Sequence, residues 1–153
     1  MFLSQHFTLR ELTRSQTAAR RGIDNRPGAG EIGNLGRLCA DILEPVRTRF
    51  GVPYSPTSGY RCARLNRLIG GAAGSQHLNG EAVDFKVPTV PNLVLARWIA
   101  QTLNFDQLIL EFPVADDPDT GWVHCSLTGR DNRKEVLTRT RGGYAKGLAA
   151  PLK

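Results

Sequence analysis

Helix-like and strand-like patterns occupy different parts of this sequence. Between residues 31 and 50 the apolar positions recur at steps of three and four, which is the period of one amphipathic helix packed on a core. Pro45 lacks a backbone donor and is expected to kink or divide that helix. Short β-branched and aromatic runs follow later in the chain. Helices first and strands later predict an α+β fold, with a small antiparallel sheet packed against N-terminal helices.

The remaining elements are predicted from caps, glycines and alternating runs. Thr8 and Glu11 form a capping-box pattern that opens a short helix, and Gly22 closes it. The other expected elements are an irregular strand over 51–61, a short helix over 62–71, a strand over 81–87, a helix over 92–103, strands over 105–112 and 122–128, and an edge strand over 134–140. With 153 residues and no linker or repeat, residues 1–153 are expected to form one domain.

Composition narrows the possible classes of protein. The three cysteines have no C-x-x-C spacing, which favours reduced thiols over a disulfide framework. The net charge of +6 favours polyanionic partners or a solvated basic surface. Because no helix-turn-helix, finger or RNP signature accompanies the basic residues, nucleic acid is not the expected partner, although a basic nucleic-acid-binding protein remains an alternative. No apolar run is long enough to predict membrane insertion.

The stretch "SQHLNGEAVDF" (75–85) carries the strongest chemical signal. His77 lies in a short glycine-interrupted loop, and Asp84 follows seven residues later inside an apolar run. A carboxylate in an apolar strand is costly unless it is paired or bound to a metal. A catalytic zinc site needs three protein ligands and an open position, and His124 could supply the third. The alternatives are a backbone hydrogen bond for Asp84 and an ordinary polar contact for His124; His6 is interpreted as structural or incidental.

Three segments carry a family resemblance. "SQHLNGEAVD" (75–84) matches the pattern S-x-H-x-x-G-x-A-x-D, "SGYRCARLNRLIGG" (58–71) contains an S-G-Y-R segment, and "GWVHCS" (121–126) holds a final histidine. Together they resemble the zinc D-Ala-D-Ala carboxypeptidase family of peptidoglycan peptidases. That family includes vancomycin-resistance D-Ala-D-Ala dipeptidases, phage endolysins and the related amino-terminal domain of hedgehog proteins. The likeness covers roughly residues 4–148, and the order of the segments looks most like that of short phage and prophage members.

The resemblance implies roles for five residues. It makes His77, Asp84 and His124 the ligands of one zinc ion per chain. Arg61 and Ser75 match positions that contact a carboxylate or carbonyl of the substrate in relatives. A guanidinium suits that role because it can bind a carboxylate in bidentate fashion, while a surface salt bridge is the alternative for Arg61.

One position departs from the family pattern. Many relatives carry a catalytic Glu or Asp three residues before the last histidine, where this chain has Gly121. If 105–112 and 122–128 pair antiparallel in an odd-sum register, Glu111 lies on the same face as His124 and can serve as general base. An edge-strand glutamate facing water is the alternative. Asp116, Asp117 and Asp119 are rival bases, although their loop "ADDPDTG" has the composition of a solvated turn.

The function implied is zinc-dependent hydrolysis of amide bonds in the stem or cross-bridge peptides of bacterial peptidoglycan, of the D-Ala-D-Ala carboxypeptidase or endopeptidase type. A phage or prophage lysis enzyme, acting as a monomer, is the expected context. The N-terminus shows no Sec signal pattern, so we expect synthesis in the host cytoplasm and action at the wall or periplasm after release, or as part of a virion. A zinc-fold wall-binding or structural module without catalysis is the alternative.

Overall fold

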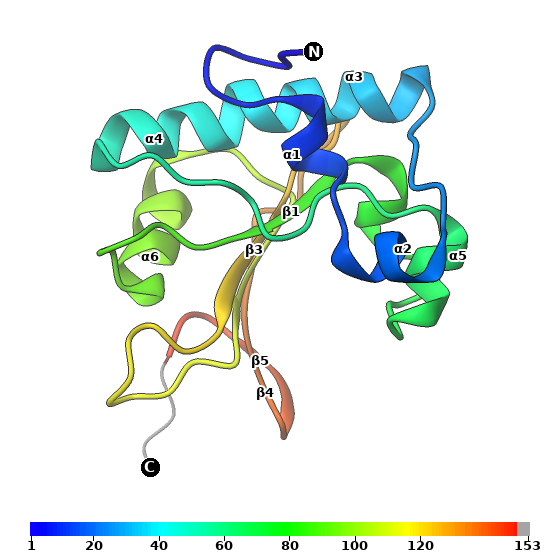
Figure 1. Ribbon diagram of the computed structural model, residues 1–153. Coiled ribbons are helices and arrows are strands. Elements are labelled where there is room, and N and C mark those ends of the chain that lie inside the picture. The colour runs from blue at the N-terminus through cyan, green and yellow to red at the C-terminus, as the bar shows by residue number, and fades with distance from the viewer. Residues whose placement is uncertain (150–153) are drawn as a thin grey trace.

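The computed structural model describes residues 1–149 and shows an N-terminal group of helices above a twisted sheet (Figure 1). Its helices are α1 (Leu9–Thr13), α2 (Gln16–Arg21), α3 (Ala29–Leu38), the π-helical turn η1 (Cys39–Leu43), α4 (Glu44–Phe50), α5 (Ala63–Leu68), the 3-10 turn η2 (Gln76–Asn79) and α6 (Asn92–Thr102). Its strands are β1 (Ala82–Phe85), β2 (Gln107–Glu111), β3 (Trp122–Ser126), β4 (Glu135–Thr140) and β5 (Gly143–Lys146). The predicted α+β class is confirmed.

The first helical segment is two helices, so the prediction of one short helix up to Gly22 was wrong. The capping box is present, because the Glu11 carboxylate accepts a hydrogen bond from the Thr8 backbone at 2.8 Å. Arg14 then takes an extended conformation with ψ of 141°, which ends α1. Ser15 caps a new helix by accepting a hydrogen bond from Ala18, and Gly22 ends it with φ of 61°. The second cap explains the break, since a serine oxygen at an N-terminus competes with helix continuation.

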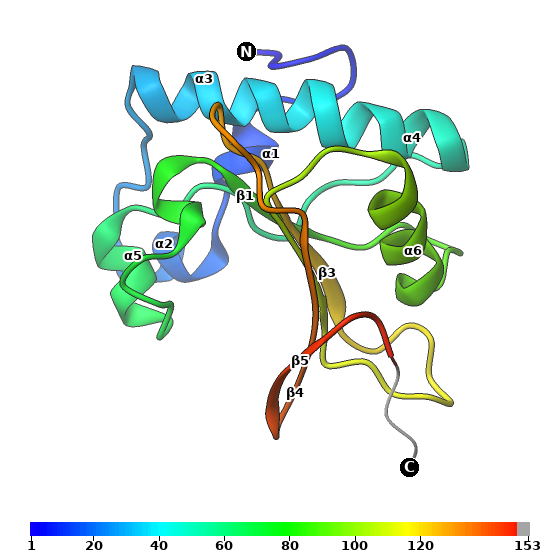
Figure 2. The same ribbon diagram turned by 180° about the vertical axis from the view of Figure 1, so that it is seen from behind.

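The long helix predicted over 31–50 forms a nearly continuous rod made of α3, η1 and α4, which crosses the top of the molecule (Figure 2). Pro45 divides it as expected. Because proline cannot donate to the carbonyl four residues back, the hydrogen-bond pattern widens just before it, and the Glu44 N–H donates to the Cys39 carbonyl. The buried positions of the rod include Leu35, Cys39, Ile42 and Val46, the predicted apolar face.

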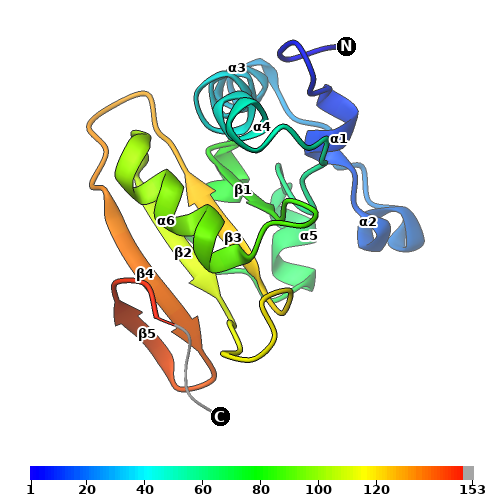
Figure 3. The same ribbon diagram turned by 90° about the vertical axis from the view of Figure 1, so that its left-hand side faces the viewer.

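The five strands form one sheet in the order β1-β3-β2-β4-β5 (Figure 3). All pairs are antiparallel except β2 with β4, which is parallel, so the sheet is mostly rather than wholly antiparallel. The chain reverses direction after β3. Strand β4 then pairs with the edge of β2 opposite β3, so β4 runs parallel to β2. The edge strand predicted over 134–140 is therefore internal, and β5, which the sequence patterns did not predict, forms the edge.

Segment 51–61 is extended but is not a strand, which corrects the expected irregular strand. It meets the sheet at a single bridge between Ser58 and Asp84. Asp84 donates its backbone N–H to the Ser58 carbonyl at 2.8 Å, and its own carbonyl accepts from Thr57 at 2.9 Å. Two prolines, Pro53 and Pro56, remove the donors that a longer ladder would need. The bridge still fixes this segment beside β1.

The two faces of the sheet have different surroundings. Alternate residues of β1, β2 and β3, such as Val83, Leu108 and Val123, join the core beneath α3, α4 and α6. The intervening residues point to the opposite face, where they line a cleft. All three cysteines are free thiols, two of them in the core, where burial raises the pKa of Cys39 to about 12. Within residues 1–149, none of the helices combines the length and apolar character needed to cross a bilayer.

Candidate active site

His77 is held rigidly by two neighbouring segments. It lies in η2 and is almost fully buried, with 2% of its side chain exposed. Its Nδ1 lies 2.6 Å from the Gly59 carbonyl, so the ring donates from Nδ1 and directs the Nε2 lone pair toward Asp84. The Arg61 backbone N–H donates in return to the His77 carbonyl at 3.1 Å. These bonds tie the S-G-Y-R segment to the histidine turn.

Two glycines allow these segments to approach each other. A Cβ on Gly59 would lie 2.3 Å from the carbonyl oxygen of Leu12 in α1, which leaves no room for a side chain. Gly80 ends η2 with φ of 68°, a conformation that favours glycine, and the chain then turns into β1. The predicted turn at Gly80 is therefore present, and it brings Asp84 back to His77.

Three potential ligand atoms converge at this point. Asp84 Oδ2 lies 3.3 Å from His77 Nε2, and Asp84 Oδ1 lies 2.9 Å from His124 Nδ1. His124 reaches Asp84 because the two residues are paired across β1 and β3. The ligand atoms of all three residues lie within 4.8 Å of one another, as in a group that could hold a metal ion.

His77 and Asp84 have the protonation states that a metal requires. Burial lowers the pKa of His77, which favours the neutral imidazole. For Asp84, burial alone would raise the pKa, but the contacts with His77 and His124 outweigh it, so the pKa lies well below its usual range and the carboxylate is ionised. Ligands about 2.0–2.2 Å from a tetrahedral zinc ion lie about 3.3–3.6 Å apart. The His77–Asp84 separation of 3.3 Å reaches that range, and the His124–Asp84 separation of 2.9 Å is shorter than it. The donor set therefore fits zinc.

A cleft of about 690 Å³ opens over the three residues. Arg61 and Ser75 line it on the side of β1, and Glu111, Arg139 and Tyr144 line it farther across the sheet. The structure thus brings every predicted site residue to one cleft. Sequence reasoning missed the contribution of β4 and β5, since no local pattern shows that β4 pairs with β2.

Glu111 occupies the predicted position next to this group. Ile109 pairs with His124 and Glu111 with Trp122, which is the odd-sum register expected from the sequence. Diagonal neighbours in such a pair are about 7–8 Å apart, so Glu111 is a near neighbour of His124 on the same face. The glutamate is 5% exposed, and its Oε2 is buried without a hydrogen-bond partner among the described residues. Burial raises the pKa of Glu111 above its ordinary value.

Gly121 cannot carry the acidic side chain that many relatives have at this position. Its φ is 82°, and a Cβ there would lie 1.9 Å from the Glu111 carbonyl oxygen. The rival residues Asp116, Asp117 and Asp119 are exposed and lie away from the residues that line the cleft. Asp117 accepts a hydrogen bond from the Asp119 backbone, as in a solvated turn.

Arg61 and Ser75 form the wall of the cleft next to His77. Arg61 Nη2 donates to Ser75 Oγ at 3.3 Å, while the Arg61 Nε is buried without a hydrogen-bond partner in the described part of the chain. Ser75 Oγ also accepts from the His77 backbone at 3.3 Å, so it caps η2. Within residues 1–149 no carboxylate lies within 4.0 Å of the Arg61 guanidinium, which argues against the surface salt bridge. His6 instead pairs with Glu44 at 2.7 Å, a contact that ties the N-terminal segment to α4.

A His–Asp–His group beside a buried carboxylate, at the bottom of an open cleft, is the arrangement of a metal-dependent hydrolase. The sequence model described as peptidase M15 matches residues 5–126, and the chain therefore belongs to the peptidase M15 family. This confirms the family resemblance of the three sequence segments. The matched range contains His77, Asp84, Glu111 and His124 and ends at the last residue of β3. A comparison with curated proteins gives no match.

Proposed function

We propose that this chain is a zinc-dependent peptidase that hydrolyses amide bonds in the stem or cross-bridge peptides of bacterial peptidoglycan. The observation that carries the proposal is the convergence of His77, Asp84 and His124 beside Glu111. One zinc ion per chain, held by the two histidines and the aspartate, would polarise the scissile carbonyl and lower the pKa of water at the open position.

Glu111 is proposed as the general base. Its carboxylate faces the cleft, and Oε2 has no hydrogen-bond partner among the described residues, so it can accept a proton from the attacking water. The raised pKa makes Glu111 a better proton acceptor than an exposed glutamate and lets it return the proton to the leaving amine. Arg139, with Nη1 3.9 Å from Glu111 Oε2, favours the ionised form.

Arg61 and Ser75 are proposed to bind the substrate. The Arg61 guanidinium is held by its Ser75 contact, and its Nε has no hydrogen-bond partner among residues 1–149, so it can donate to a carboxylate or carbonyl of the peptide. Burial lowers the pKa of Arg61, although Asp84 opposes that effect. A guanidinium remains charged in proteins even so, and this position keeps a positive charge inside the cleft.

The biological context is proposed from the family resemblance. A phage or prophage lysis enzyme that acts at the wall or periplasm, or as a virion component, agrees with the likeness to short phage members. The net charge of +6 would assist the encounter with an anionic cell wall. We further propose that residues 1–153 are one peptidase domain that acts as a monomer.

The decisive experiment is digestion of purified peptidoglycan by the zinc-loaded chain, with the released fragments identified by mass spectrometry. We expect new amine and carboxyl ends at one type of peptide bond, which decides between carboxypeptidase and endopeptidase action. His124→Ala is the control, and it should lose both bound zinc and fragment release. A chain that binds one zinc and sediments with peptidoglycan but releases nothing would be the non-catalytic wall-binding module instead.

A further inference from the structure

Four side chains form a row across the sheet next to the His–Asp–His group. Trp122 on β3 pairs with Glu111 on β2, Glu111 pairs with Arg139 on β4, and Arg139 pairs with Tyr144 on β5. Residues paired in this way lie on the same face of a sheet, and all four line the cleft. Arg139 and Tyr144 come from strands that follow the matched range 5–126.

The Arg139 guanidinium contacts two aromatic rings, and it makes no side-chain hydrogen bond to another residue within 1–149. It lies 5.1 Å from the centre of the Phe112 ring and 5.3 Å from the centre of the Tyr144 ring. Its closest acidic contact is Glu111 Oε2 at 3.9 Å, which is too long for a hydrogen bond. Since 43% of the side chain is exposed, the donors of a preoriented guanidinium remain available to a ligand in the cleft.

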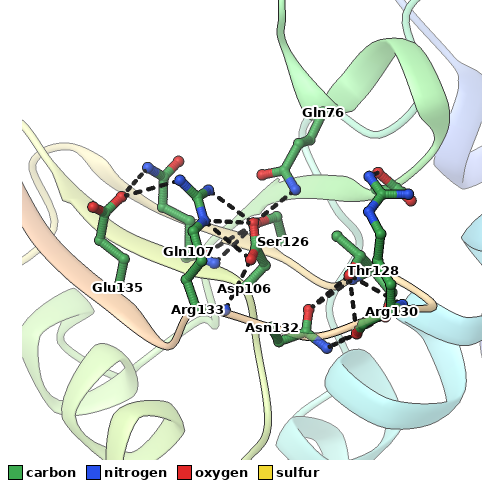
Figure 4. A network of polar contacts seen from close by, with 10 residues as sticks. Gln76, Asp106, Gln107, Ser126, Thr128, Arg130, Asn132, Arg133 and Glu135 are labelled. Atoms are coloured by element: carbon green, nitrogen blue, oxygen red, sulfur yellow. Dashed lines mark hydrogen bonds and ion pairs between the residues drawn. The ribbon is translucent and has the colours of Figure 1, made fainter.

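Arg133 also lines the cleft, but its side-chain donors already bind the Asp106 carboxylate. Its Nε and Nη2 donate to the Asp106 carboxylate at 3.1 and 2.8 Å, and its backbone N–H donates to the same carboxylate at 3.0 Å. Gln76 completes that network, in which Arg133 folds over Asp106 (Figure 4). These bonds lower the pKa of Asp106 to about 2. Arg133 therefore stabilises the start of β4, whereas the Arg139 donors make no hydrogen bond to another side chain in the described part of the protein.

Arg139 and Arg61 lie on opposite sides of the proposed reaction centre. Arg61 is beside β1, whereas Arg139 is on β4, with β3 and β2 between them. A peptide whose scissile bond lies over His124 and Glu111 would extend one arm toward each arginine. The cleft thus offers a cation to the substrate on both sides of the bond to be cut.

We propose that Arg139 is a specificity-determining residue that binds a carboxylate of the substrate, on the side of the scissile bond opposite Arg61. The inference rests on the proposed peptidase function, and it adds that the preferred substrate is an acidic peptide. A planar guanidinium that contacts two aromatic rings presents paired donors to a carboxylate, and a neutral carboxamide at the same place would lose the charge-assisted bonds.

Two matched pairs of synthetic stem peptides test this inference. In one pair D-glutamate is exchanged for D-isoglutamine, and in the other diaminopimelate is exchanged for lysine, so each exchange removes one carboxylate. We expect the wild type to prefer the carboxylate form of at least one pair by about tenfold in kcat/KM. Arg139→Gln should abolish that preference through KM, and Arg139→Lys should retain part of it. Arg141→Gln is the control, because Arg141 is exposed and lies outside the cleft lining.

The possible results distinguish a failure of the Arg139 inference from a failure of the proposed peptidase function. Equal use of both forms in each pair by the wild type overturns the inference and leaves the peptidase intact. An Arg139→Gln variant that loses kcat equally on both forms also overturns it, because Arg139 would then only position Glu111. If no peptide is cleaved, the peptidase proposal fails. The Arg139 inference is then tested by measuring how tightly the same peptides bind to the wild type and to Arg139→Gln. Binding that favours the carboxylate form only when Arg139 is present sustains it, and equal or absent binding overturns it.

Discussion

Replacing Glu111 by glutamine tests the part of the site where this chain departs from its relatives. The substitution keeps the size and shape of a side chain that is 5% exposed, and it removes the carboxylate that would accept the proton. General acid–base groups contribute about 100- to 10,000-fold, so turnover on peptidoglycan peptides should fall by that factor. This corresponds to roughly 3–5 kcal/mol in the activation barrier. Bound zinc should stay at one per chain, because Glu111 is not a proposed ligand.

The raised pKa of Glu111 leads to two further expected results, one for the pH dependence of the rate and one for stability. Only the ionised form accepts a proton, and burial raises the pKa, so the acidic limb of the pH–rate profile should lie above the range of an exposed glutamate. Glu111→Gln should lack that limb. A raised pKa in the fold means that the folded state binds more protons than the unfolded state, so this residue lowers stability as pH rises through its titration. At neutral pH the glutamine variant should therefore unfold at the same or a higher temperature.

The assays are single-peptide kinetics across pH, metal analysis and thermal unfolding. Asp119→Asn is the matched control, since Asp119 is exposed in the solvated turn, and it should keep near-full turnover. If Glu111→Gln stays active while Asp119→Asn is inactive, Glu111 is not the base, and the base comes from the loop.

Three other substitutions address the rest of the site. Asp84→Ala should lose zinc and activity together, and its melting temperature should no longer rise with added zinc; an unchanged response to zinc would exclude Asp84 as a ligand. Arg61→Ala should keep zinc by metal analysis but raise KM about tenfold or more, and loss of metal would instead make Arg61 a structural residue. Gly121→Ala should destabilise the fold by about 1–3 kcal/mol in denaturant unfolding, because φ is 82° and a Cβ would lie 1.9 Å from the Glu111 carbonyl; a neutral effect would contradict the close approach.

Much of the site could be predicted because its signals are local. The seven-residue spacing from His77 to Asp84, with Gly80 at the turn, lies within one short segment. Alternation along the strands identifies which side chains share a face, so one antiparallel pairing was enough to place Glu111 beside His124. The amphipathic period of 31–50 likewise predicted the helical rod, and Pro45 predicted its interruption.

Other features depend on contacts between distant segments, which local patterns do not encode. The division of the first helical segment is an exception, because the Ser15 cap that causes it is a local contact with Ala18, which the prediction of one helix missed. Glu111 is buried because β2 lies between β3 and β4 in the sheet. That burial raises the pKa of Glu111. Gly121 shows the same limit, because its missing side chain is explained by the nearby Glu111 carbonyl rather than by its own neighbours in sequence.

The sequence by itself determined the family, through its short motifs, and it placed Glu111 on the face of His124 once β2 and β3 were taken to pair antiparallel. The tertiary structure decided that β4 pairs parallel with β2 and that β5 forms the edge. That pairing places Arg139 opposite Glu111 and extends the cleft beyond the matched family region. The physical reason is that a strand's partner is chosen by packing and chain reversal over the whole sheet, whereas its inward and outward faces are set by its own alternation.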